Sequence, residues 1–147
     1  MSLMPTEDTN PVASANRPAY DRRYFSLAVI FALLAVVLGA FGAHALHDHL
    51  VARGSVATWE TAVDYQFWHA IALLLWVLFN AGNKGRRIIP LTFAIGILLF
   101  SGSLYILALG GPRWMGPITP LGGLSFMLGW AIWLFSGPSP LQNTHEK

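Results

Sequence analysis

Four long apolar runs constrain this chain more than any other feature of its sequence. They cover roughly residues 24–45, 65–81, 88–110 and 118–135. A helix needs about 20 apolar residues to cross the ~30 Å hydrocarbon core of a bilayer, and an isolated strand cannot satisfy its backbone there. The sequence therefore predicts an all-α, multi-pass membrane protein folded as one four-helix bundle.

The composition agrees with a membrane protein. Only 11% of the residues are charged, against about 25% in an average soluble domain. The basic pI of about 9.3 does not require a nucleic-acid partner, because Lys and Arg cluster beside the apolar runs, where membrane anchors lie. The chain has no cysteine, which excludes disulfides and thiol chemistry.

The distribution of Lys and Arg predicts the orientation. Four spans place Arg53 and Arg113 on one side and seven basic residues on the other: Arg17, Arg22, Arg23, Lys84, Arg86, Arg87 and Lys147. The positive-inside rule then places both termini in the cytoplasm, as expected for a protein of the bacterial inner membrane. Residues 1–23 and 136–147 are polar and rich in Pro, Ser and Asn, so we expect disordered cytoplasmic tails.

The first run also has features of a cleaved signal peptide. Arg22 and Arg23 precede it, and Ala43-His44-Ala45 fits the small-residue cleavage pattern. However, the run is longer than a typical signal-peptide core and follows a long tail. We therefore expect it to be retained as the first span.

Small residues recur at helical spacing in three of the runs. Membrane helices associate through such residues, because they let backbones approach closely. The residues expected at helix contacts are Ala35, Gly39, Gly42, Ala43, Gly96, Gly102, Gly122, Ser125 and Gly129. They predict a tightly packed bundle.

Polar residues gather toward one end of the predicted bundle. If the spans begin where the apolar runs begin, the outer third contains His44, Gln66, His69, Ser101, Ser103, Tyr105 and Thr119. This polar cluster is expected either to join the helices by hydrogen bonds or to hold a ligand. Trp59 is expected in the aromatic belt at the outer interface.

Three other interpretations of these residues remain open. His44 and His69 have the spacing and depth to ligate a haem from two helices, or to form part of a quinone site. His44, His47, Asp48 and His49 would suit zinc if the end of the first helix folded back. A small oligomeric transporter is a further alternative, although no acidic residue is expected within the membrane. No catalytic residue and no resident cofactor are predicted.

Five motifs occur together in a fixed order. They are GAFGAHAL (39–46), WETAVDYQFWHA (59–70), LFSGSLYILAL (99–109), GPITPLGGLSF (116–126) and Gly129-Trp130. In these motifs the chain resembles the YgdD/YwdK family of small bacterial inner-membrane proteins, a domain of unknown function with a mitochondrial relative in animals. The resemblance covers about residues 25–135 and implies four spans, but no reaction, cofactor or substrate.

The hypothesis that best fits these observations is a non-enzymatic membrane protein. It would act as an accessory or assembly subunit of a larger membrane complex, in contact with the lipid bilayer and with other subunits or further copies of itself.

Overall fold

Helices account for all the regular structure that the computed structural model describes, which comprises residues 20–80 and 87–136. Within these ranges, four helices are long and apolar enough to cross a membrane: Arg22–Ala43, Val56–Phe79, Ile88–Ala108 and Arg113–Ser136. The predicted all-α architecture with four membrane-spanning helices is therefore confirmed.

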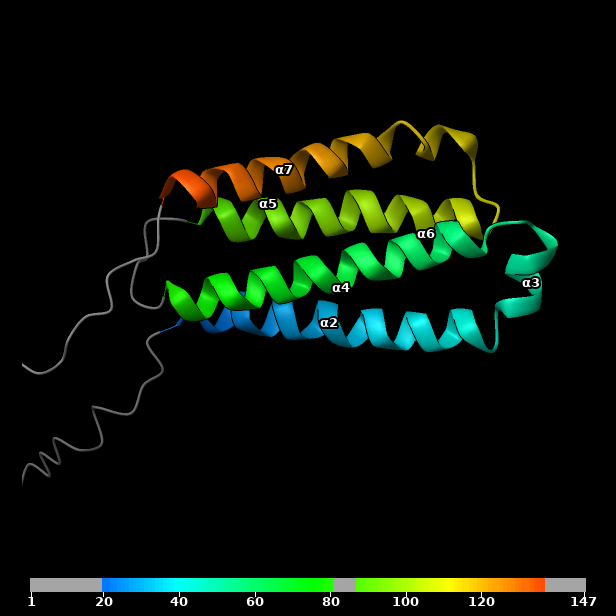
Figure 1. The fold of residues 1–147 in the computed structure, drawn as a ribbon, viewed down its shortest axis with the longest axis horizontal. Coiled ribbons are helices and arrows are strands. Elements are labelled where there is room, and N and C mark those ends of the chain that lie inside the picture. Colours follow the sequence, from blue (N-terminus) through cyan, green and yellow to red (C-terminus); the bar gives the residue numbers. More distant parts are fainter. Residues whose placement is uncertain (1–19, 81–86, 137–147) are drawn as a thin grey trace, which may run out of the picture.

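The helices run alternately in opposite directions (Figure 1). In chain order the elements are α2 (Arg22–Ala43), α3 (His47–Ala52), α4 (Val56–Phe79), α5 (Ile88–Gly96), the π-helical turn η1 (Ile97–Ser101), α6 (Gly102–Ala108), the 3₁₀ turn η2 (Arg113–Met115) and α7 (Ile118–Ser136). The start of α2 and the end of α7 lie at the same end of the bundle, and α3 lies at the other (Figure 1).

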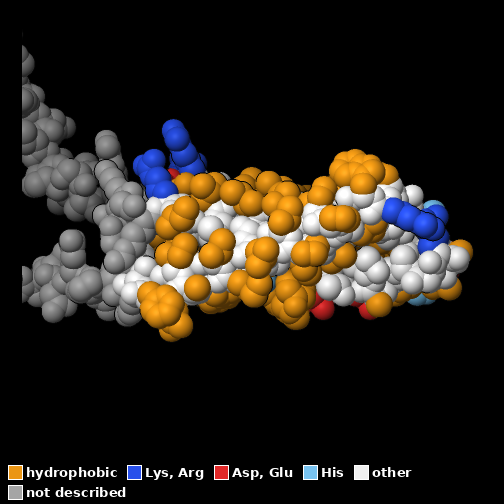
Figure 2. Space-filling view, turned by 90° about the horizontal axis from the view of Figure 1, so that it is seen from above, with side chains coloured by type: hydrophobic (Ala, Val, Ile, Leu, Met, Phe, Trp, Pro, Cys, Tyr) orange, Lys and Arg blue, Asp and Glu red, His pale blue; other side chains and the backbone are white. Residues whose placement is uncertain are grey.

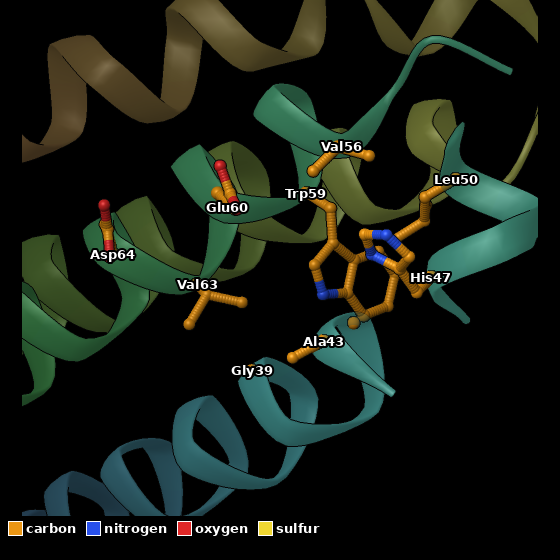
Figure 3. A pocket seen from close by; sticks show the side chains of 10 residues that line it. Gly39, Ala43, His47, Leu50, Val56, Trp59, Glu60, Val63 and Asp64 are labelled. Carbon is orange, nitrogen blue, oxygen red and sulfur yellow. The ribbon is translucent and has the colours of Figure 1, made fainter. Parts of the chain in front are cut away.

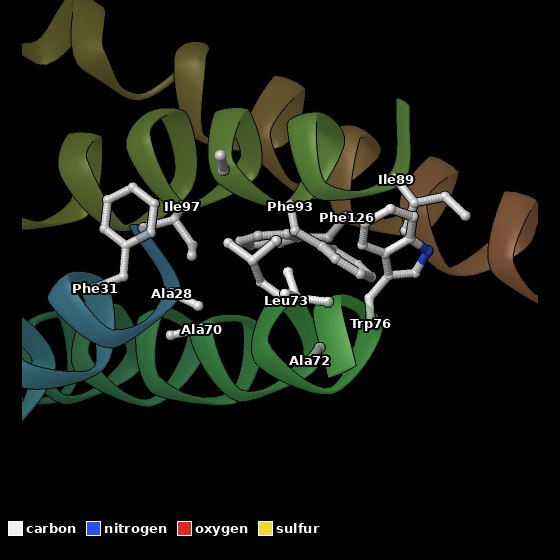
Figure 4. Close-up of a cluster of buried hydrophobic side chains, with 12 residues drawn as sticks. Ala28, Phe31, Ala70, Ala72, Leu73, Trp76, Ile89, Phe93, Ile97 and Phe126 are labelled. Carbon is white, nitrogen blue, oxygen red and sulfur yellow. The ribbon is translucent and has the colours of Figure 1, made fainter. Parts of the chain in front are cut away.

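Helix α4 is the centre of the bundle. It packs against α2 on one side and against α5, η1 and α6 on the other, while α7 packs mainly against α5 and η1. The main core lies where these helices meet and includes Phe31, Leu73, Trp76, Phe93 and Phe126 (Figure 4). Helices α2 and α7 consequently expose broad apolar faces, as lipid-facing helices do.

Three glycines allow the closest approaches between the long helices. Gly42 faces the Trp59 indole, Gly96 faces the Phe126 ring, and Gly122 faces the backbone of Phe100. A side-chain carbon at any of the three would overlap those atoms. Small residues therefore determine how closely α2 approaches α4 and how closely α7 approaches the third span.

The second helix begins earlier than the apolar run suggests. We expected this span to start at residue 65, but α4 begins at Val56, nine residues before it. Hydropathy detects where side chains become polar, whereas backbone hydrogen bonds continue through Glu60 and Asp64, which are exposed. Helix α2 ends at Ala43 and a separate short helix, α3, follows it.

The third span contains a π-helical turn that the sequence did not predict. Most of the two expected tails lies outside the described residues, as do Arg17, Lys84, Arg86 and Lys147 of the charge count. Arg22 and Arg23, assigned to the first tail, belong to α2, and Ser136 is the last residue of α7.

Candidate functional site

Gln66 joins three helices from the middle of α4. Its side chain is only 4% exposed. The amide Nε2 donates a hydrogen bond to the Phe31 carbonyl of α2 at 2.9 Å, and Oε1 accepts one from the Tyr105 hydroxyl of α6 at 3.0 Å. Both ends of the amide are thus bonded within the bundle, as a polar group in a non-aqueous interior requires.

Trp59 extends this contact toward α3. Its indole Nε1 donates to the Leu38 carbonyl at 3.0 Å, and its ring meets the Tyr105 ring edge-on, with 4.7 Å between centroids. Gly42 leaves space for the indole. The expectation of an interfacial belt residue missed this role, because Trp59 is 3% exposed and packs between helices. The sequence feature that could have revealed this role is the pair of small residues Gly39 and Gly42, which leave room for a large side chain such as Trp59 on a neighbouring helix.

His69 joins α4 to α7. Trp130 Nε1 donates to His69 Nε2 at 3.3 Å, and His69 Nδ1 lies 2.8 Å from the Tyr65 carbonyl. Because Nε2 accepts, Nδ1 carries the proton and donates to that carbonyl, which describes a neutral imidazole. The ring also stacks on Phe126, with centroids 3.5 Å apart and planes 12° apart.

His44 lies apart from this group. It is the C-terminal cap of α2 and is exposed, whereas His69 is buried. His69 is thirteen residues from the start of α4, or about 20 Å along the helix axis. The two histidines were expected at one depth because the span was taken to begin at residue 65. The structure does not bring them together.

The serines form separate contacts nearer α7. Ser103 Oγ donates to the Phe100 carbonyl at 2.9 Å and lies 2.7 Å from Thr119 Oγ1, which links α6 to α7. Ser101 is fully buried at the end of η1, and its Oγ has no hydrogen-bond partner among the described residues. The expected polar cluster is therefore divided into three groups, around Gln66, His69 and Ser103.

The residues considered for zinc lie at the α3 end of the bundle. His44, His47, Asp48 and His49 are all exposed. Among the residues that the structure describes, no three His, Cys, Asp or Glu side chains are placed to share a metal ion.

A shallow pocket of about 120 Å³ opens between α2 and α4 next to α3 (Figure 3). Its lining residues are Gly39, Gly42, Ala43, His47, Leu50, Val56, Trp59, Glu60, Val63 and Asp64. We call this surface the α2–α4 groove. Gly39 and Ala43, expected at helix contacts, line the groove, and Ala43 is exposed, whereas Ala35 and Gly42 are buried.

The other small residues lie mostly between the third span and α7. Gly96, Gly122 and Gly129 are buried. Ser125 Oγ donates to the Thr92 carbonyl at 2.8 Å. Gly102 has open space where a side chain would begin.

Comparison with known proteins assigns the chain to a family. A family model described as "Protein of unknown function (DUF423)" matches residues 38–123. The chain belongs to the DUF423 family. The match runs from α2 to α7 and includes Trp59, Gln66, His69 and Tyr105, but it ends before Trp130. The resemblance inferred from the five motifs is thereby confirmed.

Curated relatives of this DUF423 chain are named UPF0382 membrane proteins. YwdK of Bacillus subtilis is 43% identical over 114 residues, covering 74% of this chain and 90% of the relative. A Haemophilus influenzae protein is 39% identical over 109 residues, covering 74% and 87%. A Schizosaccharomyces pombe protein is 36% identical over 115 residues, covering 75% and 97%. No solved structure matches the chain.

Proposed function

We propose that this DUF423 membrane protein is a non-enzymatic accessory or assembly subunit of a larger complex in the bacterial inner membrane, with both termini in the cytoplasm. The observation that supports this proposal is that its buried polar side chains at Gln66 and His69 form their hydrogen bonds within the bundle. Gln66 and His69 each bond through both of their polar atoms to other parts of the same bundle. These side chains stabilise the helix arrangement, so the function is assigned to the outer surface.

The α2–α4 groove is the part of that surface best suited to a partner helix. Gly39 and Ala43 let another backbone approach closely. Asp64 is exposed at the rim. It is fifteen residues from the end of α4 at Phe79, or about 22 Å. If α4 enters the hydrocarbon at Phe79, Asp64 lies within its ~30 Å thickness, contrary to the expectation from the sequence that no acidic residue lies there.

An exposed carboxylate at that depth is costly without a partner. Asp64 and Glu60 lie four residues apart along one side of α4 and form no ion pair with any residue the structure describes. The partner that complements them is a membrane helix with small residues on one face and a Lys or Arg at this level. The groove would then hold the two subunits in register.

Purification of the tagged protein in a mild detergent tests this function. We expect a second membrane protein to co-purify in stoichiometric amount, and Ala43→Leu to release it by filling the groove. Ala131→Leu is the matched control, because Ala131 is exposed on α7, away from the groove. A clean homo-oligomer with no second subunit would contradict the proposal.

Neither alternative function has a supporting observation. A haem or metal bound through His69 would need its Nε2 atom, which already accepts the Trp130 hydrogen bond, and His44 is too far along the bundle to be the second ligand. The purified sample tests this as well. Soret absorbance, a bound quinone or a stoichiometric metal would overturn the non-cofactor assignment.

A further inference from the structure

A second pocket lies at the opposite end of the bundle, where α2 and α5 begin. It has a volume of about 460 Å³ and is lined by Asp21, Arg23, Tyr24, Leu27 and Arg87. Figure 2 shows basic side chains at this end directly beside the apolar surface of the helices, and a second basic group at the opposite end. The pocket therefore lies at the boundary between a cationic rim and a lipid-facing surface.

The charges in this pocket favour an anion. Arg23 and Arg87 come from two different helices, are both exposed, and form no ion pair with any described residue. Helix α5 has no acidic residue in its first turn and no side-chain cap, so the partial positive charge of its N-terminus is not offset there, whereas Asp21 caps the N-terminus of α2. The single carboxylate, Asp21, accepts the backbone N–H of Arg23 at 3.1 Å.

The lining below the arginines is apolar. Tyr24 and Leu27 are half-buried, and the α2 surface continues inward through the exposed side chains of Ile30 and Leu34. A ligand that binds both the arginines and the apolar lining needs an anionic group, such as a phosphate, joined to hydrocarbon chains. Guanidinium groups suit the phosphate, since each can donate two parallel hydrogen bonds.

We propose that this pocket binds the headgroup of an anionic glycerophospholipid. Its phosphate would lie between Arg23 and Arg87, and an acyl chain would follow Leu27, Ile30 and Leu34 along α2. Basic pockets between membrane helices on the cytoplasmic side bind anionic headgroups in this way. The site is independent of the α2–α4 groove, which lies at the other end of the bundle.

The test uses the full chain purified in detergent and titrated with phosphatidylglycerol or phosphatidylcholine. Bound lipid is counted by native mass spectrometry, and stabilisation is followed by the melting temperature. We expect phosphatidylglycerol to bind preferentially, and the double variant Arg23→Gln/Arg87→Gln to weaken its binding about tenfold or more. Arg53→Gln/Arg113→Gln removes two charges from the opposite end and should leave binding unchanged.

Three outcomes would overturn the proposal. They are equal binding of the two lipids, equal weakening in both double variants, and saturation of the site by inorganic phosphate alone, which would reassign it to a soluble anion. If the Gln pair does not fold, Arg23→Lys/Arg87→Lys replaces it. That pair keeps the charges but loses the paired hydrogen bonds, so its affinity should still fall several-fold, and an unchanged affinity would count against the site.

Discussion

At the level of single residues, His69 is a titratable side chain whose two ring nitrogens and ring face all make contacts that hold the bundle together. One ring nitrogen donates to the Tyr65 carbonyl and the other accepts from Trp130, while the ring face stacks on Phe126. A neutral imidazole has one donor and one acceptor, so this arrangement satisfies it completely. The same geometry explains why a histidine is tolerated in the middle of a membrane helix.

The replacement His69→Ala should therefore lower stability. It removes the stacking contact and leaves the Trp130 N–H without its acceptor, in surroundings where water cannot replace it. We expect the free energy of unfolding to fall by about 1–3 kcal/mol, measured by SDS titration of the protein in micelles. Trp130→Phe removes only the donor and should cost less, about 0.6 kcal/mol.

The double variant His69→Ala/Trp130→Phe then tests whether the two side chains interact with each other, apart from the packing that each makes with other residues. If the bond from Trp130 to His69 exists, the two losses are not additive, and the cycle gives a coupling energy of about 0.6 kcal/mol. Strictly additive losses would show that the two residues do not interact.

The sequence could predict some of these residues and not others. Gln66 and Tyr105 are polar residues inside apolar runs, so burial and a bonding partner were foreseeable. Trp59 and Trp130 were not, because a tryptophan near a helix end is equally compatible with an interfacial position. The position of His44 was not predictable for another reason: only the structure shows that α2 ends just before His44 and leaves its side chain exposed.

At the level of elements, the π-helical turn Ile97–Ser101 determines how α7 packs on the third span. A π turn accommodates an extra residue and shifts the backbone from the α-helical path. Gly122 of α7 lies directly against this turn at Phe100, and Gly96, just before the turn, faces Phe126. The two helices thus contact each other at paired small and aromatic positions.

Gly122→Ala should disrupt this contact, whereas Gly123→Ala should not. The new methyl group at position 122 would overlap the Phe100 backbone, which cannot move as a flexible side chain can. At position 123 the nearest atoms would lie at 3.8 Å, an ordinary packing distance. We expect Gly122→Ala to lower the melting temperature clearly and to cost about 1–3 kcal/mol.

The neighbouring variant is the control for helix propensity. Alanine favours a helix over glycine by about 1 kcal/mol, so Gly123→Ala should be neutral or stabilising. Equal melting temperatures for the two variants would mean that α7 does not approach the turn this closely.

Element boundaries were less predictable than the elements themselves. The apolar runs identified all four spans because lipid imposes a length and a composition on each. They misplaced the start of α4, since Glu60 and Asp64 interrupt the hydropathy but not the helix. The π turn has no proline or glycine signal of its own, since its five residues read ILLFS, and the one polar residue, Ser101, does not distinguish it from an α-helical turn.

At the level of the whole molecule, the two ends of the bundle differ in character. The end where α2 and α5 begin carries Arg22, Arg23 and Arg87. The end with α3 carries His44, His47, His49, Arg53 and Arg113, with Glu60 and Asp64 at the rim of the α2–α4 groove. The positive-inside rule uses this asymmetry to set orientation, and in the orientation proposed above the arginine-rich helix starts would face the cytoplasm.

The absence of cysteine makes this orientation directly testable, because any introduced thiol is unique in the chain. His49→Cys places a thiol on α3, where the native side chain is exposed, and Asn143→Cys places one near the C-terminus. A membrane-impermeant maleimide should label the first in intact spheroplasts and the second only after lysis, because only the α3 end would face outward. The reverse pattern would invert the topology and move the arginine pocket to the outer leaflet. Labelling of both before lysis would instead require an even number of crossings between them. That outcome would contradict the structure, in which three spans, α4, the third span and α7, separate the two sites.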